Sequence, residues 1–299
     1  MRLGRPETAG TLLAAASAVS YGVTIVVNRE LATRGFGPEA TLSFRFGIAA
    51  VATGVLLAAL RRPLLPAPGE RGRVLLLGAV GYATESALFY SALQRGSAAA
   101  VALVFYSYPG VVAAIEIGVR AVRPSGRLLG ALAVSIAGTA LVVATGRGVE
   151  ITGAGAVLAM GAALSYAVYV LAGSRVVTRT EPLTTGAWVA LGACLSLTAL
   201  GVVGGSLRAP GSAWWLLLLD GLATASAFCL LFAALRRLGA TRTSVVMTLE
   251  ALSAVVLGAA FLGERLGGPQ LAGGAAILAA AAAISLMRTK PPAMPVEEL

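Results

Sequence analysis

Long apolar runs separated by short polar joints dominate the chain. Ten runs reach about 20 residues, the length that an α-helix needs to cross the hydrocarbon core of a bilayer. They cover approximately residues 8–27, 39–60, 73–93, 97–119, 127–145, 152–173, 184–204, 212–235, 240–262 and 267–287. The joints carry Arg with Gly or Pro and are too short to hold a soluble domain. The pattern predicts an all-α integral membrane protein with ten transmembrane helices.

The composition supports this prediction and removes several functions. Of 299 residues, 58% are hydrophobic and only 12% are charged, whereas soluble domains carry roughly 25% charged residues. There is no histidine, and Lys290 in the tail is the sole lysine, so His-based catalysis and a nucleotide-binding Walker lysine are excluded. Cys194 and Cys229 lie inside apolar runs and give no zinc site. We expect no cofactor, no metal and no nucleotide.

The net charge of +10 is distributed as a topology signal. Sixteen Lys and Arg residues fall in the terminal segments and joints that share the side of the N-terminus, against six on the other side. The positive-inside rule then places both termini in the cytoplasm of a bacterial-type inner membrane. A basic lipid-binding surface is the alternative reading of this charge. The basic residues form no compact patch, which argues against nucleic acid as a partner.

The two halves of the chain resemble each other. Residues 10–21 and 155–166 both run from a Gly to a Ser-Tyr pair, at a shift of 145. Residues 90–95 match 232–237 at a shift of 142, and 128–131 match 271–274 at a shift of 143. Matches in one order indicate two units, 1–146 and 147–299, the second with a short cytoplasmic tail; chance similarity between alanine-rich helices is the alternative. Because each unit has five spans, an odd number, the second unit enters the membrane from the opposite side. Many secondary transporters are built from such inverted repeats around a central cavity.

Three motifs connect the chain to a known family. They are Ser43-Phe44-Arg45-Phe46-Gly47-Ile48-Ala49-Ala50 in the second span, Thr248-Leu249-Glu250-Ala251 in the ninth, and Phe261-Leu262-Gly263-Glu264-Arg265-Leu266 at its end. With these motifs the chain resembles the drug/metabolite transporter superfamily, its EamA-type ten-helix exporters, and among them the YddG-like aromatic amino-acid exporters. The resemblance implies export and is weakly specific for the substrate. Two positions depart from the pattern: Val122 corresponds to Glu264, and Ala251 corresponds to Pro109.

Ionisable groups deep in a membrane are functional candidates because their burial in lipid is costly. Glu85, Asp220 and Glu250 lie well inside the third, eighth and ninth spans. Glu116 is near the inner end of the fourth span, where we expect a structural role. Arg45 lies early in the second span, so it can snorkel to the outer interface or contact a substrate carboxylate.

Helical spacing places these acids beside aromatic residues. Tyr82, Glu85, Ser86 and Phe89 form one stripe of the third span, and a shift of 142 pairs them with Thr224, Ala227, Phe228 and Leu231. The same shift pairs Phe105 with Met247 and Tyr108 with Glu250. We expect both stripes to face the central cavity, with Phe89, Phe228 and Leu231 serving to pack helices.

A zwitterionic amino acid suits this inventory, since a carboxylate can accept from its ammonium and an aromatic ring can add cation–π attraction. The candidate substrate-binding residues are Tyr82, Glu85, Ser86, Phe105, Tyr106, Tyr108, Tyr166, Tyr169, Asp220, Thr224, Met247 and Glu250. Pro109 lies deep inside the fourth span, where it should kink the helix and provide a hinge or gate.

The sequence therefore predicts a secondary transporter, not an enzyme, that exports small amphipathic metabolites by alternating access. Amino acids, both aromatic and other neutral ones, are the first expectation for the cargo; drugs, nucleobases or sugars are the alternative. Proton coupling through Glu85 or Glu250 is a second hypothesis. Rival classes are a membrane enzyme on lipid-linked substrates, with Glu85 and Asp220 or Glu250 as acid and base, and a receptor subunit. The expected partners are a small molecule and the bilayer, with a monomer favoured over an oligomer.

Overall fold

A computed structural model describes residues 6–96, 98–120, 125–144, 151–207, 209–262 and 267–286, and these residues form a bundle of helices. The longest helices are α1 (Pro6–Thr33), α2 (Pro38–Ala59), α8 (Gly153–Val176), α9 (Pro182–Val203) and α10 (Trp214–Leu238), the last preceded by η2 (Gly211–Ala213). The others are α3 (Arg71–Leu76), η1 (Leu77–Tyr82), α4 (Ala83–Leu93), α5 (Ala98–Phe105), α6 (Tyr108–Arg120), α7 (Gly126–Ala144), α11 (Ala240–Met247), α12 (Leu249–Leu262) and α13 (Gly268–Leu286).

These elements correspond to the predicted spans. Among the described residues, six helical stretches are long and apolar enough to cross a membrane, and shorter apolar helices cover 108–119, 126–141 and 271–284. The third predicted span is the continuous series α3, η1 and α4, and the fourth is α5 followed by α6. The prediction of an all-helical membrane protein is confirmed.

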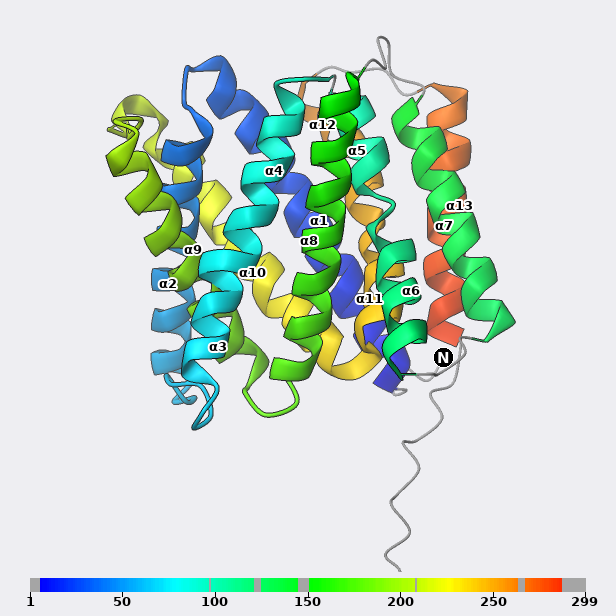
Figure 1. Cartoon of the computed structure of the whole chain (residues 1–299), viewed down its shortest axis with the longest axis horizontal. Helices are drawn as coiled ribbons and strands as arrows, with labels where there is room; N and C mark the ends of the chain where they lie inside the picture. The colour runs from blue at the N-terminus through cyan, green and yellow to red at the C-terminus, as the bar shows by residue number, and fades with distance from the viewer. Residues whose placement is uncertain are drawn as a thin grey trace, which may run out of the picture.

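The second half of the bundle runs opposite to the first. In Figure 1, α1 begins at the lower end, whereas α8, the first helix of the second half, begins at the upper end. The start of α1 and the end of α13 both lie at the lower end. We refer to these two ends of the bundle as the lower end and the upper end. Helices of the two halves therefore pass through the bundle in inverted order, as an odd number of spans per unit requires.

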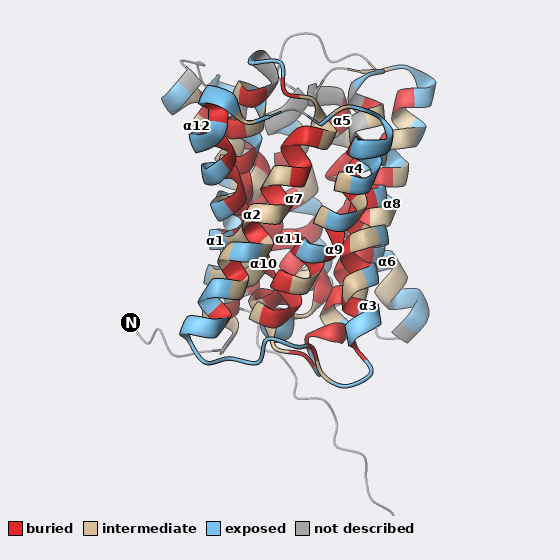
Figure 2. Cartoon of the chain, turned by 90° about the vertical axis from the view of Figure 1, so that its left-hand side faces the viewer, coloured by how far each residue is buried: buried red, intermediate tan, exposed pale blue. Residues whose placement is uncertain are grey.

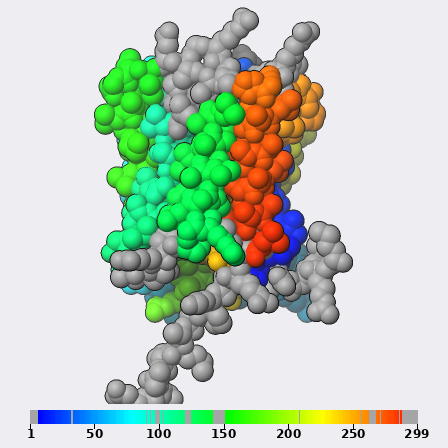
Figure 3. All heavy atoms as spheres, turned by 90° about the vertical axis from the view of Figure 1, so that its right-hand side faces the viewer, coloured from blue at the N-terminus to red at the C-terminus, as the bar shows by residue number. Residues whose placement is uncertain are grey.

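Helices from different halves pack against each other throughout the molecule. The extensive contacts join α1 to α10, α2 to α9, α4 to α8 and α7 to α13. Buried residues gather where these helices face inward, and exposed residues cover the outside (Figure 2). On one side, α7 and α13 lie next to each other at the surface (Figure 3), so these Gly- and Ala-rich spans are peripheral. The two halves are interlocked and share one core.

Glycine permits the closest of these crossings. A Cβ on Gly78 of η1 would meet the carbonyl oxygen of Val189, and one on Gly192 of α9 would meet that of Leu75, both well inside contact distance. Small residues allow such backbone approach in membranes. The π-helical segment η1 is thus pressed directly onto α9, just before the stripe that carries Glu85.

Polar contacts fasten the two halves together at the lower end. The segment 60–70, which follows α2, contacts residues 180–184, at the end of the α8–α9 turn and the start of α9. Glu70 is buried and receives Nη1 of Arg73 at 3.0 Å and Nη1 of Arg179 at 3.4 Å. Arg62 pairs with Glu181 at 3.4 Å. We call these contacts the lower clamp.

At the upper end, the corresponding contacts are mostly apolar. Phe36, in the turn between α1 and α2, is buried in a cluster with Leu216 and Leu217 of α10. The guanidinium carbon of Arg34 lies 5.7 Å from the ring centroid of Trp215. These contacts, which we call the upper clamp, join the same two halves with aromatic and aliphatic groups where the lower clamp uses ion pairs.

Candidate functional site

Arg45 points into the bundle. It lies on the inward stripe of α2 and is only 6% exposed. Its Nε donates to Oγ1 of Thr224 on α10 at 2.6 Å, and its guanidinium carbon lies 5.2 Å from the ring centroid of Phe46. Of the two alternatives for Arg45, snorkelling to the interface is therefore wrong, because the rotation of α2 turns this side chain toward α10.

Asp220 lies one helical turn before Thr224. Thr224 donates its hydroxyl to the backbone carbonyl of Asp220 at 2.8 Å, so it links the acidic turn of α10 to Arg45. Asp220 is 0% exposed, and neither of its carboxylate oxygens has a hydrogen-bond partner among the described residues. Its electrostatic partner is Arg45. An isolated buried carboxylate is costly, so the nearby guanidinium is an important neighbour.

Glu85 and Glu250 extend the charged group across both halves of the chain. Glu85 is buried and accepts from Oγ of Ser86 at 3.1 Å. Glu250 is half-buried in the first turn of α12, where the helix dipole favours a negative charge, and the Tyr106 hydroxyl lies beside it. Both acids interact electrostatically with Arg45 and with each other. Arg45 of α2 therefore interacts electrostatically with three acids, Glu85 in the first half and Asp220 and Glu250 in the second.

Aromatic rings surround this charged group. The Tyr82 ring centroid lies 5.1 Å from that of Phe46, 5.4 Å from that of Phe228 and 5.4 Å from that of Tyr169. Tyr166 continues the network, 5.6 Å from Tyr169 in a stacked arrangement. Edge-to-face and offset geometries of this kind are the favoured ones for aromatic pairs. Phe46, which was not among the predicted site residues, is therefore a central member of the site.

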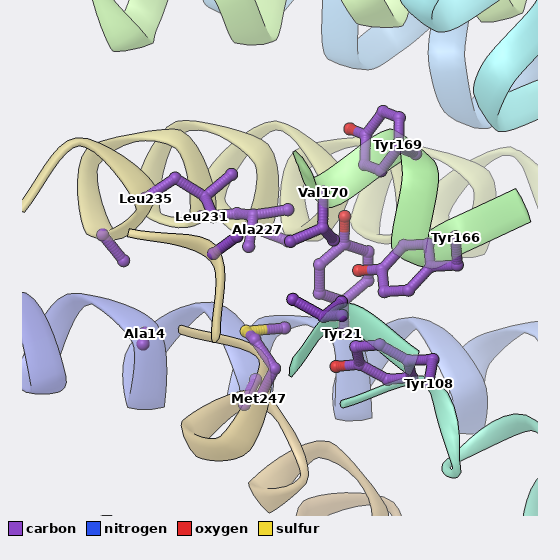
Figure 4. Packing of buried hydrophobic residues seen from close by; sticks show 14 of the residues in the cluster. Ala14, Tyr21, Tyr108, Tyr166, Tyr169, Val170, Ala227, Leu231, Leu235 and Met247 are labelled. Carbon is purple, nitrogen blue, oxygen red and sulfur yellow. The ribbon is translucent and has the colours of Figure 1, made fainter. Parts of the chain in front are cut away.

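A second group of rings lies where the fourth span is interrupted. Phe105 ends α5 and Tyr108 begins α6, and both contact Tyr166, at centroid distances of 5.5 and 4.8 Å. Figure 4 shows Tyr108 and Tyr166 close to Met247 and Tyr21, which come from other helices. Tyr21 was not among the candidates, although its partner at the 145 shift, Tyr166, was. That shift is the signal that could have found Tyr21.

The ninth span is interrupted at the same place as the fourth. Met247 ends α11 and Leu249 begins α12, and Met247 is the predicted repeat partner of Phe105. In the first half, Pro109 follows the interruption, in the first turn of α6, so the helix stops and restarts rather than kinking. In the second half the interruption forms with Ala251 at the matching position. Interrupted helices at mid-membrane depth are where many transporters bind substrate.

Most candidate residues share this interior. Those buried in it are Tyr82, Glu85, Ser86, Phe105, Tyr106, Tyr108, Tyr166, Tyr169, Asp220, Thr224 and Met247. Phe228 and Leu231 pack helices together as expected, and Phe89 contacts Phe105 at 5.1 Å. Glu116 accepts from Thr241 of α11, in keeping with its expected structural role. Glu264 and Val122 lie outside the described residues.

Cys194 and Cys229 are free thiols. The described residues contain no group of three or more Cys, Asp or Glu side chains that could hold a metal ion.

Inverted halves, interrupted helices and a charged, aromatic interior define a membrane carrier. The model of the EamA-like transporter family matches residues 8–144 and again 153–286. The chain therefore belongs to the EamA-like transporter family, as its motifs suggested. The predicted unit boundary at 146/147 falls between the two matched ranges and outside the described residues.

Two curated relatives match half of the chain. They are the threonine/homoserine exporters RhtA of Salmonella typhimurium strains SL1344 and LT2, each 35% identical over 144 residues. The match covers 46% of this chain and 47% of each relative, so the chain spans about half the length of the curated relatives it matches. A crystal structure of 20% sequence identity superposes with a TM-score of 0.77 over 92% of this chain and 96% of that one, which shows that the fold is shared.

Proposed function

We propose that this carrier exports zwitterionic amino acids by alternating access. The observation that carries the proposal is that Arg45 lies buried inside the bundle and interacts electrostatically there with Glu85 and Glu250. An α-amino acid presents a carboxylate and an ammonium group a short distance apart, so its binding site needs fixed charges of both signs. The carboxylate would bind Arg45, and the ammonium would bind Glu85 or Glu250.

The surroundings of these charges support the same substrate class. The rings of Tyr82, Tyr166 and Tyr169 offer flat apolar surfaces to a neutral or aromatic side chain. Asp220, fully buried behind Thr224, would serve as the counter-charge that keeps Arg45 in place. The relatives' names concern amino-acid export, and the family is one of transporters, which argues against a membrane enzyme. A monomer in the inner membrane with both termini in the cytoplasm completes the proposal.

Counterflow in liposomes tests this assignment. Purified protein is reconstituted with internal phenylalanine or threonine, and uptake of the labelled amino acid is measured against external competitors. Phenylalanine should compete, whereas phenethylamine, which lacks the carboxylate, and N-acetylphenylalanine, which lacks the ammonium, should compete at least tenfold less well. Arg45→Gln should remove the preference for phenylalanine over phenethylamine, and Arg71→Gln, an exposed change on α3, should not.

Two results would contradict the proposal. Equal competition by all three compounds would show that the binding site does not recognise the carboxylate or the ammonium group of the substrate. Competition by an uncharged drug, nucleobase or sugar, with no competition by amino acids, would show that the site binds the alternative class of substrate.

We also propose proton coupling as a second property of the same site. Within the described interior, three carboxyl groups share one guanidinium, so a proton can replace a missing counter-charge on Glu85 or Glu250. An imposed pH gradient should drive export in the native protein, and Glu85→Gln or Glu250→Gln should reduce the driven component. If the pH gradient leaves the flux unchanged in the native protein and in both variants, the carrier performs facilitated transport without proton coupling.

A further inference from the structure

A groove opens on the outside of the bundle, at the lower end and away from the charged interior. It has a volume of about 760 Å³ and lies between α3 and η1 on one side and the last turns of α8 on the other. Both walls reach the lower end of the bundle in Figure 1. The lining residues include Arg73, Leu76, Val80, Ala172, Arg175 and Arg179.

The lining changes from charged to apolar along the groove. Leu76 and Val80 are 59% and 57% exposed and continue the wall above Arg73. Val80 lies seven residues beyond Arg73, about two helical turns further from the lower end. The basic mouth therefore lies at the membrane surface while the apolar wall extends into the hydrocarbon region. A phospholipid has its charged and apolar parts in the same order.

The charge at the mouth favours an anion. Three guanidinium groups line the groove with one carboxylate, that of Glu70. Arg73 and Arg179 contact this buried carboxylate at 3.0 and 3.4 Å, whereas Arg175 is exposed and has no ion-pair partner among the described residues. Positive charge remains in excess, in a place that a headgroup can reach.

We propose that this groove binds an anionic phospholipid. The phosphate would lie against Arg175, beside Arg73 and Arg179, and an acyl chain would lie along Leu76 and Val80. Basic pockets between transmembrane helices at a cytoplasmic surface are suited to acidic lipid headgroups. A soluble anion could use the mouth but would leave the apolar wall uncovered. Arg73 and Arg179 line the groove and also pair with Glu70 in the lower clamp. The bound lipid would therefore lie next to the contact that joins the two halves.

Ligand-dependent stabilisation of the full-length protein in detergent tests the proposal, since a molecule that binds the folded state raises the apparent unfolding temperature. The probes are dioctanoyl phosphatidylglycerol, dioctanoyl phosphatidylcholine and glycerol 3-phosphate. Phosphatidylglycerol should raise the unfolding temperature most, and glycerol 3-phosphate should leave it unchanged. Arg175→Gln should raise the half-saturating phosphatidylglycerol concentration about fivefold, because each arginine near an anionic headgroup contributes about that factor.

The matched control is Arg71→Gln. It removes an exposed arginine at the start of α3, also at the lower end of the bundle, that does not line the groove. It should bind phosphatidylglycerol like the native protein, and native mass spectrometry should count the same lipid retention. Equal effects of the two phospholipids, an equal response to glycerol 3-phosphate, or equal behaviour of the two variants would overturn the proposal. Displacement of a labelled amino acid by the lipid would instead mark the groove as a side entrance for substrate.

Discussion

At the scale of single residues, the interior of this carrier is symmetric in packing and asymmetric in charge. The residue that matches Glu85 in the other half is Ala227, and the residue that matches Glu250 is Tyr108. Asp220 corresponds in the same way to Gly78. The duplicated helices form the walls of the interior, and each acidic residue occurs in one half only. This asymmetry can orient a substrate that has two different charged ends.

Thr224 should act as a positioning residue for Arg45. Its hydroxyl accepts from Nε at 2.6 Å, and a hydrogen bond to a charged group contributes about 1.5–3 kcal/mol. Thr224→Val keeps the shape and removes the bond, so the KM for the amino acid should rise about tenfold with a smaller change in maximal rate. Thr224→Ser should restore the native KM. Thr53→Val, which removes a buried hydroxyl that bonds to Ala49 and to the Cys229 thiol, is the control. Equal KM values for all variants would show that Arg45 does not need the contact with Thr224.

At the scale of helices, the sequence predicted positions better than orientations. The apolar run 39–60 corresponds to α2 within one residue at each end, because an interruption of hydrophobicity marks where a helix leaves the membrane. The rotation of α2 about its own axis depends on what α9 and α10 present to it. For this reason the inward position of Arg45 was not determined by its place in the run.

Interruptions within helices were partly predictable. Pro109 indicated a distortion of the fourth span, since proline lacks the donor that a continuous helix needs, although the predicted kink is a break between α5 and α6. Nothing comparable announced the break at Thr248, where Ala251 occupies the position of the proline, or the π-helical turn of η1. These features depend on packing between distant segments, such as Gly78 against Val189, which a local pattern does not contain.

We propose that the fourth span flexes at Pro109. Pro109→Ala supplies an N–H that can bond to the carbonyl of Phe105 and join α5 to α6. The maximal transport rate should fall several-fold while the KM changes little, and counterflow kinetics would measure both. Unchanged transport would instead show that this break, like the one before Ala251, is held by packing alone.

The crossing of η1 and α9 should be intolerant of any side chain at Gly192. A Cβ there would lie 2.9 Å from the backbone nitrogen of Ala79, so Gly192→Ala should lower the unfolding free energy by about 1–3 kcal/mol, as overpacking does. Gly54→Ala on α2 is the control, because a Cβ at Gly54 meets no atom within 4 Å. Thermal unfolding in detergent measures both variants; equal stability would mean that the crossing can relax.

At the scale of the whole molecule, the two halves are inverted, so different loops and helix ends meet at the lower end and at the upper end. The orientation of the bundle in the membrane remains a prediction from the charge distribution. Single cysteines test it after Cys194 and Cys229 are replaced by alanine. Leu207→Cys at the upper end should react with an impermeant maleimide in intact cells, and Leu65→Cys at the lower end should react only after permeabilisation. The reverse pattern would place the termini outside.

The two clamps respond to different solution conditions. The lower clamp depends on ion pairs whose arginines are exposed to water, whereas the upper clamp depends on buried Phe36 and its apolar neighbours. Dissolved salt screens exposed charges over about 8 Å at physiological ionic strength and has little effect on apolar contacts. Rising salinity should therefore loosen one end of the carrier selectively.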